Sequence, residues 1–146
     1  MKGAMGADSS EYLDVGKRAL PELRELLFLV DHMHGLGRVE TLANIDYQGT
    51  SFPLIALSFG PDDPSAPVFA VFGGVHGLER IGTRVALSYL QTLMELARWD
   101  RCIQRMFETT RLVMVPLVNP VTMHESPSNA KTKEEQFAPL GLAVAV

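Results

Sequence analysis

A short apolar segment that stops at two glycines and is followed by a histidine and a glutamate constrains this chain more than any other feature. Residues 67–72 read Pro-Val-Phe-Ala-Val-Phe, and residues 73–79 read Gly-Gly-Val-His-Gly-Leu-Glu. An apolar run of this length between turn residues is typical of a buried strand, and the spacing over 80–100 predicts a helix. His76 and Glu79 are therefore expected just beyond the C-terminal end of a strand, where the loops of an open α/β sheet form binding crevices.

The residue types on this turn favour a metal site. Imidazole nitrogen and carboxylate oxygen both bind zinc, and a catalytic zinc uses three protein ligands and leaves a fourth position for water. The glycines of the segment 73–79 allow close approach of the backbone, so His76 and Glu79 can surround one point. The alternative is a surface turn that starts the next helix, because the helix dipole favours a carboxylate such as that of Glu79 there.

At these residues the chain resembles the zinc carboxypeptidase superfamily, including its succinylglutamate desuccinylase and aspartoacylase branch. The segment 73–79 is similar to the Gly-Gly-x-His-Gly-x-Glu form of the superfamily's His-x-x-Glu element. A second similarity lies at residues 111–120, Arg-Leu-Val-Met-Val-Pro-Leu-Val-Asn-Pro, which looks like the next core strand and the family's Asn-Pro turn. Together the two matches extend the resemblance over roughly residues 40–123.

The resemblance implies a zinc-dependent amide hydrolase of carboxypeptidase type, a metallopeptidase that trims peptides at the C-terminus. Zn²⁺ would be bound by His76, Glu79 and a downstream histidine. Arg80 is a candidate for binding an anionic substrate, with a salt bridge at the helix start as the alternative, and Asn119 either contacts substrate or caps its turn. An N-acyl amino acid deacylase, a catalytically inactive binding module of the same fold and a structural α/β domain are the alternative functions.

The remaining catalytic groups of the family are not found in the sequence. A third zinc ligand, a general-base glutamate and a substrate-binding arginine are expected downstream, and His124 follows the Asn-Pro turn too closely to be that ligand. We therefore expect residues 1–125 to be the N-terminal part of a zinc-carboxypeptidase-like domain and residues 126–146 to be an irregular tail. On this interpretation the chain is a portion of a longer enzyme, exposes apolar surface and has little activity alone.

The pattern along the chain predicts an α/β fold. Leucines at helical spacing predict an amphipathic helix over 20–30, and residues 39–47 and 51–59 are expected to form a hairpin. The helix over 80–100 would connect two parallel strands in a βαβ crossover. The expected fold is a mixed sheet with an antiparallel hairpin, a parallel crossover and helices on both faces. The crossover helix should carry one apolar stripe, made up of Ile81, Val85, Tyr89, Leu93 and Leu96.

Charge and composition exclude other classes. A net charge of -4 and a pI near 5.5 do not provide the basic surface that nucleic acid needs. The sequence has neither the apolar core of a secretory signal near Met1 nor the roughly 18 uninterrupted apolar residues of a membrane helix. A cytoplasmic location is therefore expected, and the resemblance implies peptide or N-acyl amino acid substrates. The single cysteine, Cys102, lies in an amphipathic stretch and is predicted to be a buried thiol.

Overall fold

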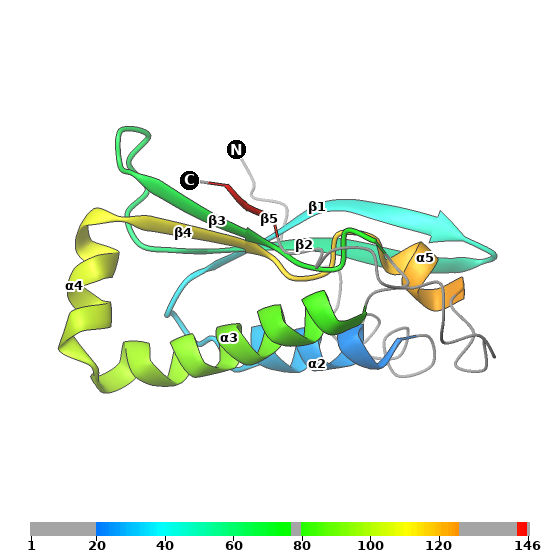
Figure 1. Ribbon diagram of the computed structural model, residues 1–146, viewed down its shortest axis with the longest axis horizontal. Coiled ribbons are helices and arrows are strands. Elements are labelled where there is room, and N and C mark those ends of the chain that lie inside the picture. Colours follow the sequence, from blue (N-terminus) through cyan, green and yellow to red (C-terminus); the bar gives the residue numbers. More distant parts are fainter. Residues whose placement is uncertain (1–19, 77–79, 126–142, 146) are drawn as a thin grey trace, which may run out of the picture.

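A computed structural model of the chain describes residues 20–76, 80–125 and 143–145, which form one mixed sheet and a set of helices (Figure 1). The sheet order is β1-β2-β4-β3-β5. The strands are β1 (Arg38–Tyr47), β2 (Thr50–Phe59), β3 (Val68–Phe72), β4 (Arg111–Val115) and β5 (Ala143–Ala145). The helices are α2 (Pro21–Asp31), α3 (Arg80–Trp99), α4 (Arg101–Thr109) and α5 (Pro120–Glu125).

The predicted hairpin is confirmed. Strands β1 and β2 pair in antiparallel fashion, and Gln48 and Gly49 connect them with φ angles of 48° and 77°. Positive φ at both central residues is the geometry that matches the twist of two paired strands, and glycine reaches it easily. The hairpin then joins the rest of the sheet through β2, whose Leu57 lies opposite Met114 of β4 in a second antiparallel pair.

The predicted parallel crossover is also confirmed. Strands β3 and β4 run parallel, with Val71 opposite Met114. Their connection contains two helices, because α3 ends at Trp99 and α4 begins at Arg101, with Asp100 between them as the N-cap of α4. The Asp100 carboxylate accepts hydrogen bonds from the backbone N–H groups of Cys102 and Ile103 at 2.7 and 3.2 Å, which satisfies donors that the first turn of α4 leaves unpaired.

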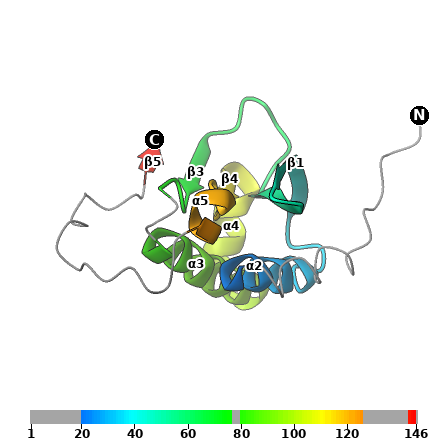
Figure 2. The ribbon, with the colours of Figure 1, turned by 90° about the vertical axis from the view of Figure 1, so that its right-hand side faces the viewer.

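The α/β class and the mixed sheet confirm the sequence prediction, and the placement of helices on both faces stays a prediction. Figures 1 and 2 show α2 and α3 side by side on one face of the sheet. Between them and the sheet lies the core, in which Leu23, Leu57 and Leu90 have no exposed surface. Among the described helices, none is both long enough and apolar enough to cross a membrane.

The buried face of α3 differs from the predicted stripe. Leu93 is buried, but Ile81, Val85 and Tyr89 are 59%, 51% and 40% exposed. Successive residues of an i, i+4 series rotate by about 40° around a helix, so the two ends of a long series lie on different faces. The residues that face the core or α2 are Thr83, Ala86, Leu87, Leu90, Leu93 and Met94. An exposed apolar stripe of Ile81, Val85 and Tyr89 therefore remains on α3.

The prediction of a buried Cys102 is wrong, because the structure places this side chain on the surface of α4. Helix α4 contacts the core only through its partly buried Ile103 and Phe107, which are four residues apart and share one face. Phe107 stacks on Phe59 of β2, with ring centroids 5.6 Å apart and an interplanar angle of 16°. Cys102 precedes Ile103 by one residue and is rotated by about 100° from it, away from the sheet.

The last described strand, β5, pairs antiparallel with β3 over Ala70 to Phe72. It belongs to the segment 126–146, for which the sequence predicted an irregular tail. Residues 126–142 and 146 lie outside the described part of the chain, so the domain division at residue 125 stays a prediction.

A hydrogen bond connects the hairpin to α5. The Tyr47 hydroxyl, next to the hairpin turn, donates to the Glu125 carboxylate at the end of α5. This bond to the carboxylate, together with its negative charge, raises the pKa of Tyr47 above 10.0. Because the pKa is raised in the folded state, the stabilisation is complete below the unfolded pKa near 10 and is lost as the pH rises through the folded value.

We therefore expect alkaline titration to release this contact. Spectrophotometric titration of tyrosinate in the folded protein should contain one step above the pH of an ordinary tyrosine, and this step should be missing in Tyr47→Phe. Tyr89→Phe is the matched control and should retain the high step. An unchanged titration curve in Tyr47→Phe would contradict the contact.

Candidate functional site

His76 lies at the carboxyl edge of the parallel pair, as the sequence predicted. It follows β3 by four residues and is exposed to solvent. Glu79, the second predicted ligand, lies outside the described residues, and the description resumes at Arg80, the first residue of α3. His76 therefore lies at the edge where open α/β sheets commonly bind ligands.

Three backbone hydrogen bonds hold the start of the His76 loop against the chain that follows β4. The N–H of Gly73 donates to the carbonyl of Val115, and the carbonyls of Gly73 and Gly74 accept from the N–H groups of Val118 and Asn119, each at 2.9 Å. The loops after the two parallel strands are thus joined at the edge where a ligand would bind. The sequence predicted both loops but not these bonds between them.

The glycine at position 74 is required by two independent constraints. Its φ angle is +63°, which is unfavourable for a residue with a side chain. A Cβ atom there would also come within 2.3 Å of Oγ1 of Thr83, a fully buried residue of α3. The loop therefore packs directly on α3, and this contact is possible only without a side chain at position 74.

Asn119 makes two hydrogen bonds, one through its backbone and one through its side chain. Its backbone N–H binds Gly74, as described above, and its Oδ1 accepts a hydrogen bond of 3.2 Å from the N–H of Thr122 in the first turn of α5. This geometry is that of an N-cap. It supports the capping alternative of the sequence analysis, and a substrate contact by Asn119 stays a prediction.

Arg80 forms the salt bridge that the sequence analysis gave as its alternative role, but with a partner that sequence reasoning did not identify, Glu22. The Nη1 of Arg80 lies 3.4 Å from Oε1 of Glu22 in α2, and the Nε of Arg84 lies 3.7 Å from the same oxygen. The side chain of Glu22 is only 2% exposed. The spacing from Glu22 to Leu26 and Leu29, four and seven residues on, is the signal that could have indicated its burial.

The other histidines do not join His76 in a metal cluster. His124 packs its ring on Phe52, with centroids 5.4 Å apart, and His32 binds the carbonyl of Phe28 through Nδ1 at 2.7 Å. No group of three His, Cys, Asp or Glu side chains that could hold a metal ion occurs in the described ranges. These residues alone therefore do not form a zinc centre, since His76 is the one expected ligand among them.

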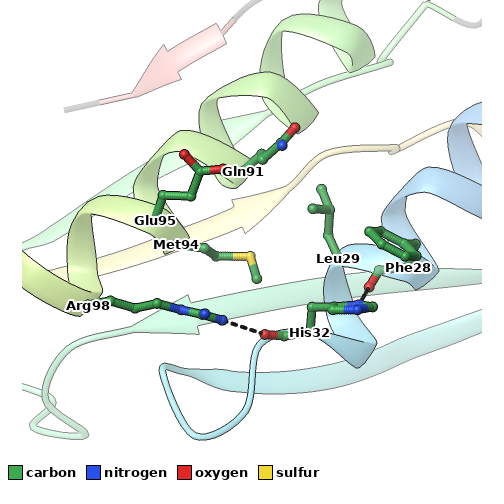
Figure 3. A pocket seen from close by; sticks show the side chains of 7 residues that line it. All are labelled: Phe28, Leu29, His32, Gln91, Met94, Glu95 and Arg98. Carbon is green, nitrogen blue, oxygen red and sulfur yellow. Dashed lines mark hydrogen bonds between the residues drawn. The ribbon is translucent and has the colours of Figure 1, made fainter.

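A groove between α2 and α3 is a separate feature (Figure 3). Its volume is about 180 Å³, and one side of it is closed by a hydrogen bond of 3.2 Å from Arg98 to the carbonyl of His32. The groove is lined by Phe28, Leu29, His32, Gln91, Met94, Glu95 and Arg98. Ligand sites for small molecules commonly have about 300 Å³ or more, so we do not assign this smaller groove as a substrate site.

A comparison with protein families shows which family the chain belongs to. Residues 39–120 match the family described as zinc carboxypeptidase, and this match includes the hairpin, the His76 loop and the Asn-Pro turn. The chain belongs to the zinc carboxypeptidase family. The family is one of metallopeptidases, and the resemblance predicted from the residues 73–79 and 111–120 is confirmed.

Two solved carboxypeptidase structures share the fold of this zinc carboxypeptidase family member. A candidate carboxypeptidase A from Shewanella denitrificans OS-217 has a TM-score of 0.58 and 18% identity, over 70% of this chain and 26% of that chain. A metallo-carboxypeptidase from Burkholderia cenocepacia has a TM-score of 0.57 and 16% identity, over 70% of this chain and 28% of that chain. The chain thus spans about a quarter of the length of the solved structures that it matches.

Proposed function

We propose that this chain contributes the His76–Glu79 part of a zinc-dependent amide hydrolase of carboxypeptidase type, which trims peptides at the C-terminus. The observation that carries the proposal is the position of His76, on a glycine-lined loop after β3 within the segment that matches the zinc carboxypeptidase family. The carboxypeptidase names of the solved neighbours favour peptide trimming over N-acyl amino acid deacylation.

The roles of the individual residues follow from this proposal. His76 and Glu79 would be two of three ligands of a zinc ion, which when bound polarises an amide carbonyl and activates water. Arg80 and Asn119 are the proposed substrate-binding residues. In the structure, Arg80 is held by Glu22 and Asn119 caps α5, so both would act from positions fixed by other contacts.

The third zinc ligand and the general-base glutamate of the family are not identified in this sequence. Besides His76, the sequence contains three histidines, His32, His34 and His124. We therefore propose that the chain alone has little hydrolytic activity and that residues 1–125 represent one part of the catalytic domain. Peptide or N-acyl amino acid substrates and the cytoplasmic location likewise stay predictions.

Zinc affinity tests the proposed ligand. Equilibrium titration of the purified chain with zinc should show binding that His76→Ala weakens at least about tenfold, because loss even of a residue that supports a ligand costs about 10- to 100-fold. His124→Ala is the matched control and should bind zinc as the unchanged chain does. Equal affinities of the unchanged chain and His76→Ala would exclude His76 as a ligand.

Hydrolysis tests the reaction class. The chain with zinc is assayed against C-terminal amino acid amides, short peptides and N-acyl amino acids, and little turnover is expected. Turnover of N-acyl amino acids alone would favour the deacylase. Rapid zinc-dependent peptide hydrolysis that His76→Ala abolishes would support the carboxypeptidase function and contradict the prediction that catalytic groups are missing from the chain. Zinc binding without any turnover would fit the inactive binding module as well.

A further inference from the structure

Glu22 carries a buried carboxylate that has no role in the proposed function. It lies in the first turn of α2, and only 2% of its side chain is exposed. Glutamate is almost never fully buried without a partner, because removing its charge from water is unfavourable. Neighbouring Glu25, in the same helix, is exposed. The burial of Glu22 therefore requires a local explanation, which its partners supply.

The partners of Glu22 come from the first two turns of α3. Nη1 of Arg80 lies 3.4 and 3.5 Å from the two carboxylate oxygens, and Nε of Arg84 lies 3.7 Å from Oε1. These two arginines are four residues apart and share one helix face. The side chain of Arg84 is 68% exposed, whereas that of Arg80 is 33% exposed, so Arg80 is the better shielded partner. Charge pairs are screened less when they are shielded from water.

Arg80 extends the contact to a third element. Its Nη2 donates a hydrogen bond of 3.3 Å to the carbonyl of Met123 in α5. Through one guanidinium group, Glu22 of α2 is thus connected to the start of α3 and to α5. The same α5 begins next to Asn119, whose N–H binds Gly74 at the other end of the His76 loop.

Contacts of described residues therefore fix the chain before His76 and the start of α3 after it. Backbone hydrogen bonds hold Gly73 and Gly74, and the ion pair with Glu22 holds Arg80, six residues after Gly74. We propose that Glu22 is a positioning residue: by fixing Arg80, it holds the start of α3, the helix that follows His76 in the chain. The effect on metal binding rests on the proposed function, whereas the effect on α3 does not.

Hydrogen–deuterium exchange of the metal-free chain tests this inference. The Glu22→Gln variant keeps the size of the side chain and removes its charge, and Glu25→Gln is the matched control on an exposed position of the same helix. In Glu22→Gln, amides in the second turn of α3, the first that donate hydrogen bonds within the helix, should exchange at least about tenfold faster, because an unanchored helix end frays. Amides of the second half of α3 and of β4 should change much less, as should all amides of Glu25→Gln.

The outcomes separate positioning from general stability. Equal acceleration at all protected amides of Glu22→Gln would show a merely structural role, and exchange identical to that of Glu25→Gln would show no role; either result overturns the proposal. If Glu22→Gln does not fold, Glu22→Asp keeps the charge but shortens its reach, and a smaller acceleration confined to the same amides is expected. Unaltered exchange in Glu22→Asp would then overturn the proposal.

Zinc titration of the same variants distinguishes this inference from the proposed function. Glu22→Gln should weaken zinc binding several-fold, with partial recovery in Glu22→Asp, whereas His76→Ala should weaken zinc binding without accelerating exchange in α3. If His76→Ala does not affect zinc binding, the proposed function fails, while the exchange result still decides the positioning role. If only His76→Ala affects zinc binding, the connection between Glu22 and the metal fails.

Discussion

Replacing Gly74 with alanine is expected to lower the free energy of unfolding by about 2 to 5 kcal/mol. The first cause is backbone conformation, because a side chain at a φ angle of +63° is unfavourable. The second cause is the close contact with Thr83, whose Oγ1 lies 2.3 Å from the position of the new Cβ. Unfolding in urea measures the loss as a shift of the midpoint.

Gly49→Ala is the matched control for the conformational part. Gly49 has a φ angle of +77° with nothing within 4 Å of an added Cβ, so alanine there should cost only about 1 to 2 kcal/mol. Thr83→Ala in the Gly74→Ala background should recover part of the loss through removal of the clash. Equal effects of Gly74→Ala and Gly49→Ala would contradict the close packing of the loop on α3.

Phe59→Ala is expected to lower the free energy of unfolding by about 3 to 5 kcal/mol. Phe59 has no exposed surface, and its ring stacks on Phe107, one of the two residues through which α4 contacts the core. The substitution therefore leaves a cavity and removes a contact that holds α4 on the sheet. Urea unfolding measures the total loss, and hydrogen exchange in α4 measures the local part.

Phe28→Ala is the control for Phe59→Ala. Phe28 lies on α2 and is 57% exposed, so its loss should cost less than about 1 kcal/mol. Similar destabilisation by the two substitutions would contradict the assignment of Phe59 to the core. Exchange in α4 that stays unchanged in Phe59→Ala would contradict the proposed attachment of this helix.

The parts of the fold that could be predicted from sequence depend on local patterns. The hairpin is encoded by two segments of strand-forming residues around Gln48 and Gly49, whose φ angles suit the turn. The segment 67–79 combines strand-forming residues, paired glycines and a following helix, which is sufficient to predict the position of His76 at the sheet edge. These patterns need only neighbouring residues, and both predictions are confirmed.

The burial of single side chains could not be predicted in the same way. Ile81, Val85 and Tyr89 have apolar side chains at helical spacing, but α3 presents another face to the sheet and to α2. Glu22 is polar and buried because Arg80, far along the chain, pairs with it. Both outcomes depend on how helices are placed against each other, which the spacing within one helix does not determine.

The candidate site was predictable only in part for a similar reason. The motif places His76 correctly, but the bonds of Gly73 and Gly74 to the segment after β4 join residues far apart in sequence. A third ligand is absent from the sequence pattern, and the described residues contain no cluster of three potential ligands. Whether His76 and Glu79 share a metal ion is a question for the zinc titration.

The exposed thiol of Cys102 makes the chain well suited to spectroscopy. It is the single cysteine of the sequence, and it lies on the helix whose attachment depends on Phe59 and Phe107. A maleimide dye or a nitroxide label would therefore attach at one defined place without prior mutagenesis. The same accessibility allows two chains to cross-link through a disulfide in air, so that reducing agent belongs in every buffer until it is removed just before labelling.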